Sequence, residues 1–196
     1  MNLSLDAILQ PLLYVDIKSL ISVLFWGNLV STGLILAFRM FTPFSRHREH
    51  TLFFILARAL QSVAWFLLLL RDQLPDAVSV NLGNSFLFLG FYFEARCMLK
   101  VIQAESLTVR RIGIIITASC IFLFNMAEML KPGDPAFRVA IASLCVFLTL
   151  CIPTYQLLRF PDKSHFRIIV GVFYLVFTIT QLPRSVVAFL YPMGLH

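Results

Sequence analysis

The sequence predicts an all-α integral membrane protein, a polytopic bundle of six transmembrane helices. Of its 196 residues, 59% are hydrophobic and only 13% are charged, which leaves too little polar surface to cover a water-soluble globule. The apolar residues gather into six runs, each close to the length that a bilayer demands. These runs cover residues 16–40, 51–70, 75–101, 112–130, 136–158 and 166–191. We therefore expect one compact bundle over residues 16–196, without a separate soluble domain.

The segments between the runs are short and carry turn or charge signals, of which 132–135 (Pro-Gly-Asp-Pro) is the clearest. Before the first run, residues 1–15 contain Asp6 and no Lys or Arg, unlike a signal peptide. Leucines recur in this arm at roughly helical spacing, so it would form an interfacial helix or remain an irregular tail.

The distribution of positive charge predicts the orientation of the bundle. Most Lys and Arg residues follow the first, third and fifth runs, namely Arg39, Arg46, Arg48, Arg96, Lys100, Arg110, Arg111, Arg159, Lys163 and Arg167. Connections rich in Lys and Arg face the cytoplasm, so the N-terminus should lie outside. The net charge of +6 then reflects membrane topology, and we expect the lipid bilayer rather than a nucleic acid as partner.

Four charged residues, Arg58, Glu94, Glu128 and Arg184, lie inside the apolar runs, where an unpaired charge is costly and usually has a function. Arg58 and Glu94 lie at similar depth, about 10 Å inside the cytoplasmic boundary at 1.5 Å per residue. They are predicted to form a buried ion pair that locks the second and third helices together. Small residues on the face of Glu94, including Gly90, would let the two helices approach closely.

A second polar cluster is predicted toward the outer side. Asn125 and Glu128 share a helical face, Gln181 and Arg184 lie near the kink-prone Pro183, and Arg184 would reach Glu128 or an entering anion. The guanidinium fork suits a carboxylate ligand. The candidate pocket comprises Asn28, Asn84, Asn125, Glu128, Gln181 and Arg184. The alternative is a network of hydrogen bonds that only holds the helices together.

Catalytic and cofactor signatures are missing from the sequence. Its lysines lie at the ends of the runs, unsuited to a retinal Schiff base, and its histidines lie outside them, unsuited to haem. Four cysteines without metal-ligand spacing are expected to be small core residues rather than disulfides: Cys97, Cys120, Cys145 and Cys151. We expect no catalytic residue, metal or cofactor.

A distinctive series of residues occupies the second and third runs: Arg58-Ala59-Leu60-Gln61, Trp65, Leu70-Arg71, Leu74-Pro75-Asp76, Ser79, Gly83-Asn84, Gly90 and Glu94. Together with Tyr14, Asp16, Ile17 and Gly27-Asn28-Leu29, it resembles the N-terminal multi-span sensor region of certain bacterial diguanylate cyclases. The resemblance covers roughly residues 16–101, and the remainder matches only in its pattern of spans.

The resemblance implies a sensory module in the bacterial cytoplasmic (inner) membrane but no particular ligand. From the outer polar cluster we expect a small anionic or lipid-like ligand. The resemblance also implies a longer parent, with a seventh helix, a cytoplasmic GGDEF domain that makes cyclic di-GMP, and a homodimeric state. The abrupt end at Tyr191–His196 agrees with a truncated seven-helix sensor, and no GGDEF signature occurs, so we expect no enzyme activity in this chain. The alternatives are a small-molecule transporter or channel-like bundle, and a structural membrane anchor.

Overall fold

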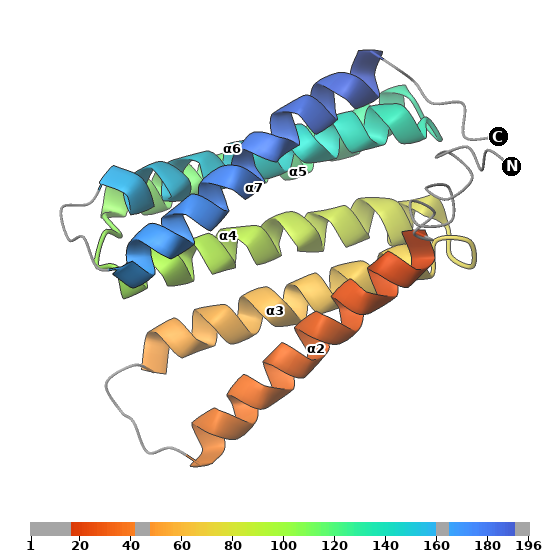
Figure 1. The fold of residues 1–196 in the computed structure, drawn as a ribbon. Coiled ribbons are helices and arrows are strands. Elements are labelled where there is room, and N and C mark those ends of the chain that lie inside the picture. The colour runs from red at the N-terminus through yellow and green to blue at the C-terminus, as the bar shows by residue number, and fades with distance from the viewer. Residues whose placement is uncertain (1–16, 42–47, 160–164, 191–196) are drawn as a thin grey trace, which may run out of the picture.

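A computed structural model describes residues 17–41, 48–159 and 165–190, and these residues form an all-helical bundle (Figure 1). The helices in chain order are α2 (Ile17–Phe41), α3 (Arg48–Leu69), η2 (Ala77–Leu82), α4 (Gly83–Val101), α5 (Leu107–Leu130), α6 (Pro135–Arg159) and α7 (His165–Leu190). The prediction of a helical bundle is confirmed. The predicted N-terminal arm and the segment Tyr191–His196 lie outside the described residues.

Helix boundaries differ from the predicted runs at two places. Helix α5 begins at Leu107, five residues before the predicted start, because the Ser106 hydroxyl accepts a hydrogen bond from the Val109 amide at 3.1 Å and caps the first turn. The third run is divided into a short π-helical segment, η2, and the α-helix α4. Polar residues that precede an apolar run can therefore belong to the same helix, as they do at the start of α5.

Five of the long helices, α2, α3, α5, α6 and α7, are long and apolar enough to cross a membrane. Helix α4 differs because its 19 residues include three charged ones, Glu94, Arg96 and Lys100. It lies in the middle of the bundle, packed against α3, α5 and α6. Neighbouring helices therefore surround a helix that carries three charged residues in its second half.

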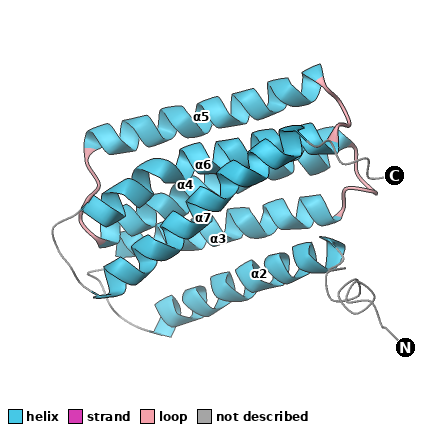
Figure 2. Ribbon diagram, turned by 45° about the horizontal axis from the view of Figure 1, so that its top comes forward, coloured by secondary structure: helices cyan, strands magenta, loops and turns pink. Residues whose placement is uncertain are grey.

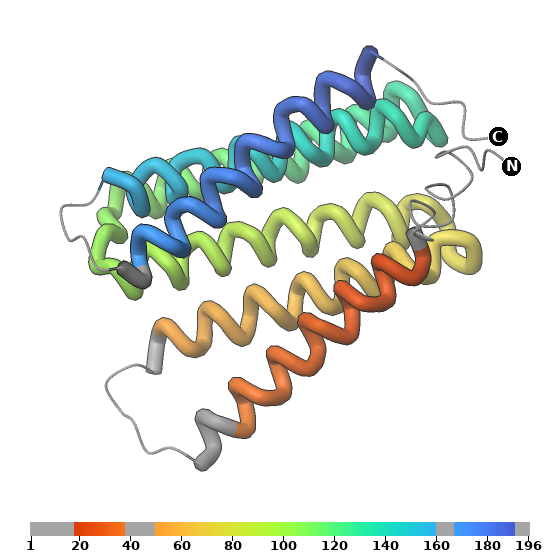
Figure 3. Tube along the Cα trace, in the orientation of Figure 1, coloured from red at the N-terminus to blue at the C-terminus, as the bar shows by residue number. Residues whose placement is uncertain are grey.

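The helices run up and down in alternation, and α2 and α7 form two edges of the bundle. Helix α3 packs between α2 and α4, while α6 packs against α7, α5 and α4. Figure 2 shows α5 on the side of α6 and α4 away from α2. Because of this alternation, the helix ends that flank the three Lys- and Arg-rich connections lie at the same end of the bundle (Figure 3).

The core lies between α4, α5 and α6. Phe88 of α4 meets Phe124 of α5 edge to face, with 5.7 Å between ring centroids, and both side chains are fully buried. By contrast, the outer faces of α2 and α7 expose large apolar side chains such as Val23 and Phe189. This is the reverse of a water-soluble surface.

The four cysteines are free thiols, and their placement departs from the prediction in one case. Three of them, Cys97, Cys120 and Cys145, are buried, whereas Cys151 is exposed on α6. The expectation that all four are core residues is therefore wrong for Cys151, which faces away from the neighbouring helices. Its apolar sequence surroundings do not distinguish a core face from a lipid face.

Candidate functional site

Arg58 and Glu94 form the predicted ion pair between α3 and α4, with 2.9 Å between Arg58 Nη2 and Glu94 Oε1. Two further groups bind the same carboxylate. Gln61 Nε2 donates to Glu94 Oε2 at 2.7 Å, and the Tyr174 hydroxyl of α7 donates to Glu94 Oε1 at 3.1 Å. Gln61 reaches this position because it lies three residues after Arg58, on the same face of α3.

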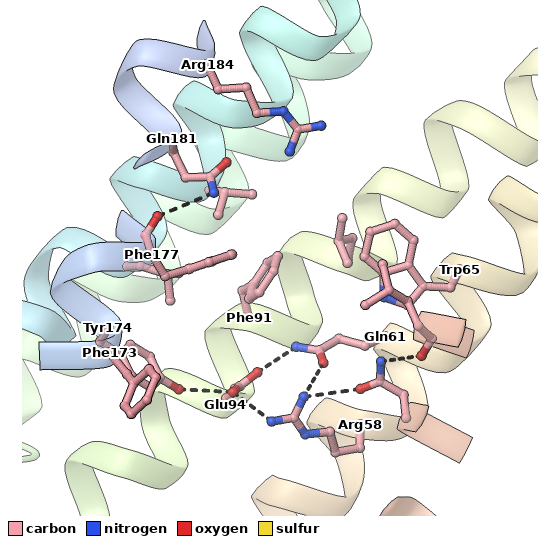
Figure 4. Close-up of a pocket in the computed structure, with 15 residues that line it drawn as sticks. Arg58, Gln61, Trp65, Phe91, Glu94, Phe173, Tyr174, Phe177, Gln181 and Arg184 are labelled. Carbon is pink, nitrogen blue, oxygen red and sulfur yellow. Dashed lines mark hydrogen bonds and ion pairs between the residues drawn. The ribbon is translucent and has the colours of Figure 1, made fainter. Parts of the chain in front are cut away.

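Arg58 also donates hydrogen bonds to two uncharged side chains. Its Nη1 donates to Gln61 Oε1 at 3.0 Å and to Asn28 Oδ1 of α2 at 3.2 Å. Asn28 in turn donates from Nδ2 to the Leu24 carbonyl at 2.7 Å. We call Asn28, Arg58, Gln61, Glu94 and Tyr174 the Glu94 network. It joins four helices, and Figure 4 shows its bonds as dashed lines.

Close packing of α3 on α4 brings these groups together. A Cβ atom on Gly90 would lie 2.7 Å from Gln61 Cγ and 3.2 Å from the Ala57 carbonyl oxygen. Only glycine allows this approach, one helical turn before Glu94. The predicted role of small residues on this face of α4 is confirmed at Gly90.

The Glu94 network borders a cavity of about 470 Å³. Side chains from α2, α3, α4, α6 and α7 line it: Leu24, Asn28, Arg58, Gln61, Trp65, Leu87, Phe91, Glu94, Val146, Leu150, Phe173, Tyr174, Phe177, Gln181 and Arg184. Its volume falls within the usual range for small-molecule sites, and its composition, mostly apolar with a few polar groups, is typical of them.

Arg184 lies at the opposite end of this cavity from the Glu94 network (Figure 4). It follows Tyr174 by ten residues, which corresponds to about 15 Å along α7. Within the part of the chain that the structure describes, its guanidinium has neither a hydrogen bond nor an ion pair. Gln181, one turn earlier, is buried and donates only a long 3.4 Å bond to the Phe177 carbonyl.

The sequence divided the charged residues into an inner pair and an outer site, and the structure corrects this division. Asn28, Gln181 and Arg184 of the predicted pocket share one cavity with the inner pair, Arg58 and Glu94. Arg58 and Arg184 differ in depth, as predicted, but Asn28, which the sequence placed in the outer pocket, bonds Arg58 at the inner depth. The space between α7 and the α2–α3 pair runs past both depths. A division by depth along single helices cannot detect such a space.

Glu128 does not belong to this cavity, and its partner is Arg138 rather than Arg184. Arg138 Nε lies 2.6 Å from Glu128 Oε2, its Nη2 contacts Glu128 Oε1, and the same Nη2 lies 2.6 Å from Asp76 Oδ2. Arg138 and Glu128 are 7% and 8% exposed. The three residues tie together α5, α6 and the segment that precedes η2.

The two remaining residues of the predicted pocket also lie elsewhere. Asn84 donates to the Val80 carbonyl one turn earlier, at 2.8 Å. Asn125 donates to the Ile121 carbonyl at 2.7 Å and to Ser85 Oγ at 3.4 Å, between α5 and α4. Both amides serve helix packing, and neither lines the cavity.

Sequence reasoning missed Arg138 and Tyr174. Arg138 lies near the start of the predicted run 136–158 and was not singled out, although a signal was present: Glu128 and Arg138 flank the short turn at 132–135 at matching depth, which places them opposite each other. Tyr174 carried no comparable signal, because tyrosine is common on apolar helices. Its hydroxyl is recognisable only once α7 is placed beside Glu94.

An exposed ion pair joins the start of α2 to the connection after α3, with 2.6 Å between Lys18 Nζ and Asp72 Oδ2. The hydrogen bond and positive charge of Lys18 lower the pKa of Asp72. This contribution is present near neutral pH and is lost as the pH falls through the lowered pKa. Both side chains are mostly exposed, so the pair adds little to stability.

Comparisons with protein-family models, with curated proteins and with solved structures found no match to this chain. The fold and the site therefore define its class by themselves. It is a helical bundle in which five helices have the length and hydropathy of membrane spans, and a cavity with charged groups at both ends lies between α2, α3, α4, α6 and α7.

Proposed function

We propose that this chain is the membrane-embedded, ligand-binding module of a sensor. Five apolar helices of spanning length and the exposed apolar faces of α2 and α7 support a multi-pass location in the membrane. The ends that flank the Lys- and Arg-rich connections lie together (Figure 3), as expected if they face the cytoplasm and the N-terminus lies outside.

The cavity between α2, α3, α4, α6 and α7 carries the proposal. Charged groups are rare in spans, and those found there commonly mark a ligand or ion site. Here the Glu94 network and Arg184 converge on one space of about 470 Å³. A purely structural anchor would need the Glu94 network but not the cavity.

The contacts of α7 suggest how binding would change the bundle. Helix α7 packs along α6, whereas the side chains that join it to α4 include Tyr174, bonded to Glu94, and Phe177, whose ring centroid lies 6.0 Å from that of Phe91. All four side chains line the cavity. A ligand there would alter the position of α7 relative to α3 and α4. It would then bind two packings of the bundle with different affinity, as a sensor requires.

Sensing is favoured over transport by the closed end of the cavity. Beyond the Glu94 network, toward the start of α3, the next turns hold the buried apolar residues Ala57 and Cys97, and Phe54 packs against the Arg58 guanidinium at 5.0 Å from its ring centroid. A transporter path would continue through this layer with polar groups.

The output of the module is proposed from the resemblance alone. A cytoplasmic domain that makes cyclic di-GMP, regulated through a further helix in a bacterial inner-membrane homodimer, would use the movement of α7. The chain itself is proposed to be without catalytic activity.

The proposal is tested by filling the cavity. Leu24 lines it from α2, whereas the adjacent Val23 is 67% exposed and points away. Leu24→Trp should therefore block the cavity, and Val23→Trp is its matched control. Native mass spectrometry of protein purified from membranes in mild detergent should show a retained small molecule in the parent and in Val23→Trp, and its loss in Leu24→Trp.

A second measurement tests the sensory response. In a Cys151→Ala background, spin labels at the exposed positions Val30 of α2 and Val187 of α7 report the distance between the two edges of the bundle. Adding a membrane lipid extract should shift this distance distribution in the parent and not in Leu24→Trp. A clean protein mass together with an unchanged distribution would overturn the proposed function.

A further inference from the structure

We propose that the cavity binds a single-chain amphiphile: its one anionic head lies on Arg184, and its apolar body lies between α7 and the α3–α4 pair. This inference rests on the proposed ligand-binding function and specifies the chemistry of its ligand. It follows from the charge balance, the walls, the volume and the opening of the cavity.

The charge balance selects an anion. In the Glu94 network, the carboxylate of Glu94 neutralises Arg58, and the remaining members are uncharged. Arg184 is the other charged residue among those that line the cavity, and no described residue neutralises it. The cavity thus carries one uncompensated positive charge, on a group whose planar fork binds carboxylate or phosphate oxygens in pairs.

The walls between the two charged ends are apolar and mainly aromatic. Phe91 and Phe177 face each other across the space below Arg184, with Trp65 on the α3 side (Figure 4). Leu87, Val146 and Leu150 line the side of α4 and α6. The ligand body beyond the head must therefore be apolar over most of the distance to the Glu94 network, about 15 Å along α7.

The volume of the cavity accommodates one apolar chain of medium length. At about 30 Å³ per non-hydrogen atom, the share of a water molecule in the liquid, 470 Å³ holds roughly 16 such atoms. This suits a fatty acid of medium length or the chain of a lysophospholipid.

The opening of the cavity indicates arrival from an apolar phase. Helices α2 and α7 both line the cavity but do not pack against each other within the described ranges. Their outer faces expose apolar side chains, for example Leu34 and Phe189. A molecule dissolved among lipid chains would therefore pass between α2 and α7 without leaving an apolar environment.

The test is a titration of protein in nanodiscs of uncharged lipid at pH 8 with dodecanoate. Trp65 lines the cavity, so its emission in a Trp26→Phe background reports binding. Saturable binding is expected, and Arg184→Gln should weaken it about ten- to hundredfold. Arg184→Lys should weaken it less, because the charge remains without the fork. The control Arg159→Gln, which changes an exposed arginine away from the cavity, should bind like the parent.

Dodecanol is the matched uncharged probe and should bind at least tenfold more weakly than dodecanoate. Equal binding of both probes, or equal binding of dodecanoate to Arg184→Gln and the parent, would overturn the assignment of an anionic head. If Leu24→Trp still abolished such charge-independent binding, the proposed ligand-binding function would stand. Saturable binding of neither probe, together with no retained molecule in native mass spectra, would overturn both.

Two natural sources supply the same chemistry, a free carboxylate and a phosphate-bearing lysophospholipid. Competition between dodecanoate and a lysophosphatidylglycerol of equal chain length distinguishes them. We expect each ligand to displace the other from the parent, and neither to bind well to Arg184→Gln. Failure of each to displace the other would mean that they occupy different places and would contradict a shared head site on Arg184.

Discussion

Replacing Gly90 by alanine tests the packing that holds the Glu94 network together. The new Cβ would lie 2.7 Å from Gln61 Cγ, 3.3 Å from the Gln61 backbone nitrogen and 3.2 Å from the Ala57 carbonyl oxygen. The first contact is too close to persist, and the other two involve backbone, which cannot turn aside. Helix α4 must therefore move away from α3, or Gln61 must leave Glu94.

The expected cost follows from two opposing terms. Overpacking in a tight interior costs about 1–3 kcal/mol. The greater helix propensity of alanine returns up to about 1 kcal/mol. The free energy of unfolding should therefore fall by about 1–2 kcal/mol for Gly90→Ala, and the melting temperature by about 2–4 °C per kcal/mol for a chain of this size.

Gly27→Ala is the matched control, because a Cβ at Gly27 meets nothing within 4 Å. This variant gains the propensity term alone and should be more stable by about 0.5–1 kcal/mol. Thermal unfolding in detergent, followed by tryptophan emission, compares the two. The two substitutions should shift the melting temperature in opposite directions. A rise of similar size in both would refute the claim that α3 and α4 require glycine at position 90.

Three other predictions concern residues that the sequence placed differently or missed. Arg138→Gln should lower the free energy of unfolding by about 3–5 kcal/mol, because the buried Glu128 carboxylate loses its partner. In a chemical unfolding titration, the double variant with Glu128→Gln should recover much of the lost stability. Equal stability of the single variant and the parent would contradict the pairing. Tyr174→Phe should lower the free energy of unfolding by about 1 kcal/mol, because the hydrogen bond to Glu94 is lost. It should also broaden the distribution of spin-label distances between α2 and α7, and a distribution like that of the parent would disprove this. In folded protein in detergent, N-ethylmaleimide should label Cys151 before any other thiol, as measured by intact mass. Labelling of Cys97, Cys120 or Cys145 before unfolding would show that these thiols are not buried.

The Arg58–Glu94 pair was predictable because depth along a helix can be counted from the sequence. Each residue advances about 1.5 Å, so two opposite charges at equal distance from the same boundary of neighbouring helices are natural partners. The same reasoning would have paired Glu128 with Arg138 across the turn at 132–135. Arg138 lies near the start of the predicted run 136–158 and of α6, but it was not considered as a partner for Glu128.

The candidate pocket was only half predicted, for a different physical reason. Asn28, Gln181 and Arg184 do line the cavity, but Asn84, Asn125 and Glu128 lie in other contacts. Asparagines in apolar helices can bond a carbonyl one turn earlier just as well as a ligand. Whether an asparagine bonds a backbone carbonyl or a ligand depends on what its face of the helix packs against.

The sequence by itself determined the helices of this protein, their approximate ends and the depth of each charged residue. These properties follow from the length of apolar runs, from turn residues and from the constant rise of a helix, which are local. Only the tertiary structure decided that the Glu94 network and Arg184 border one cavity and that Tyr174 joins α7 to Glu94. Both depend on how far apart packed helices stand and in which direction each face points, and these are set by contacts between residues distant in the chain.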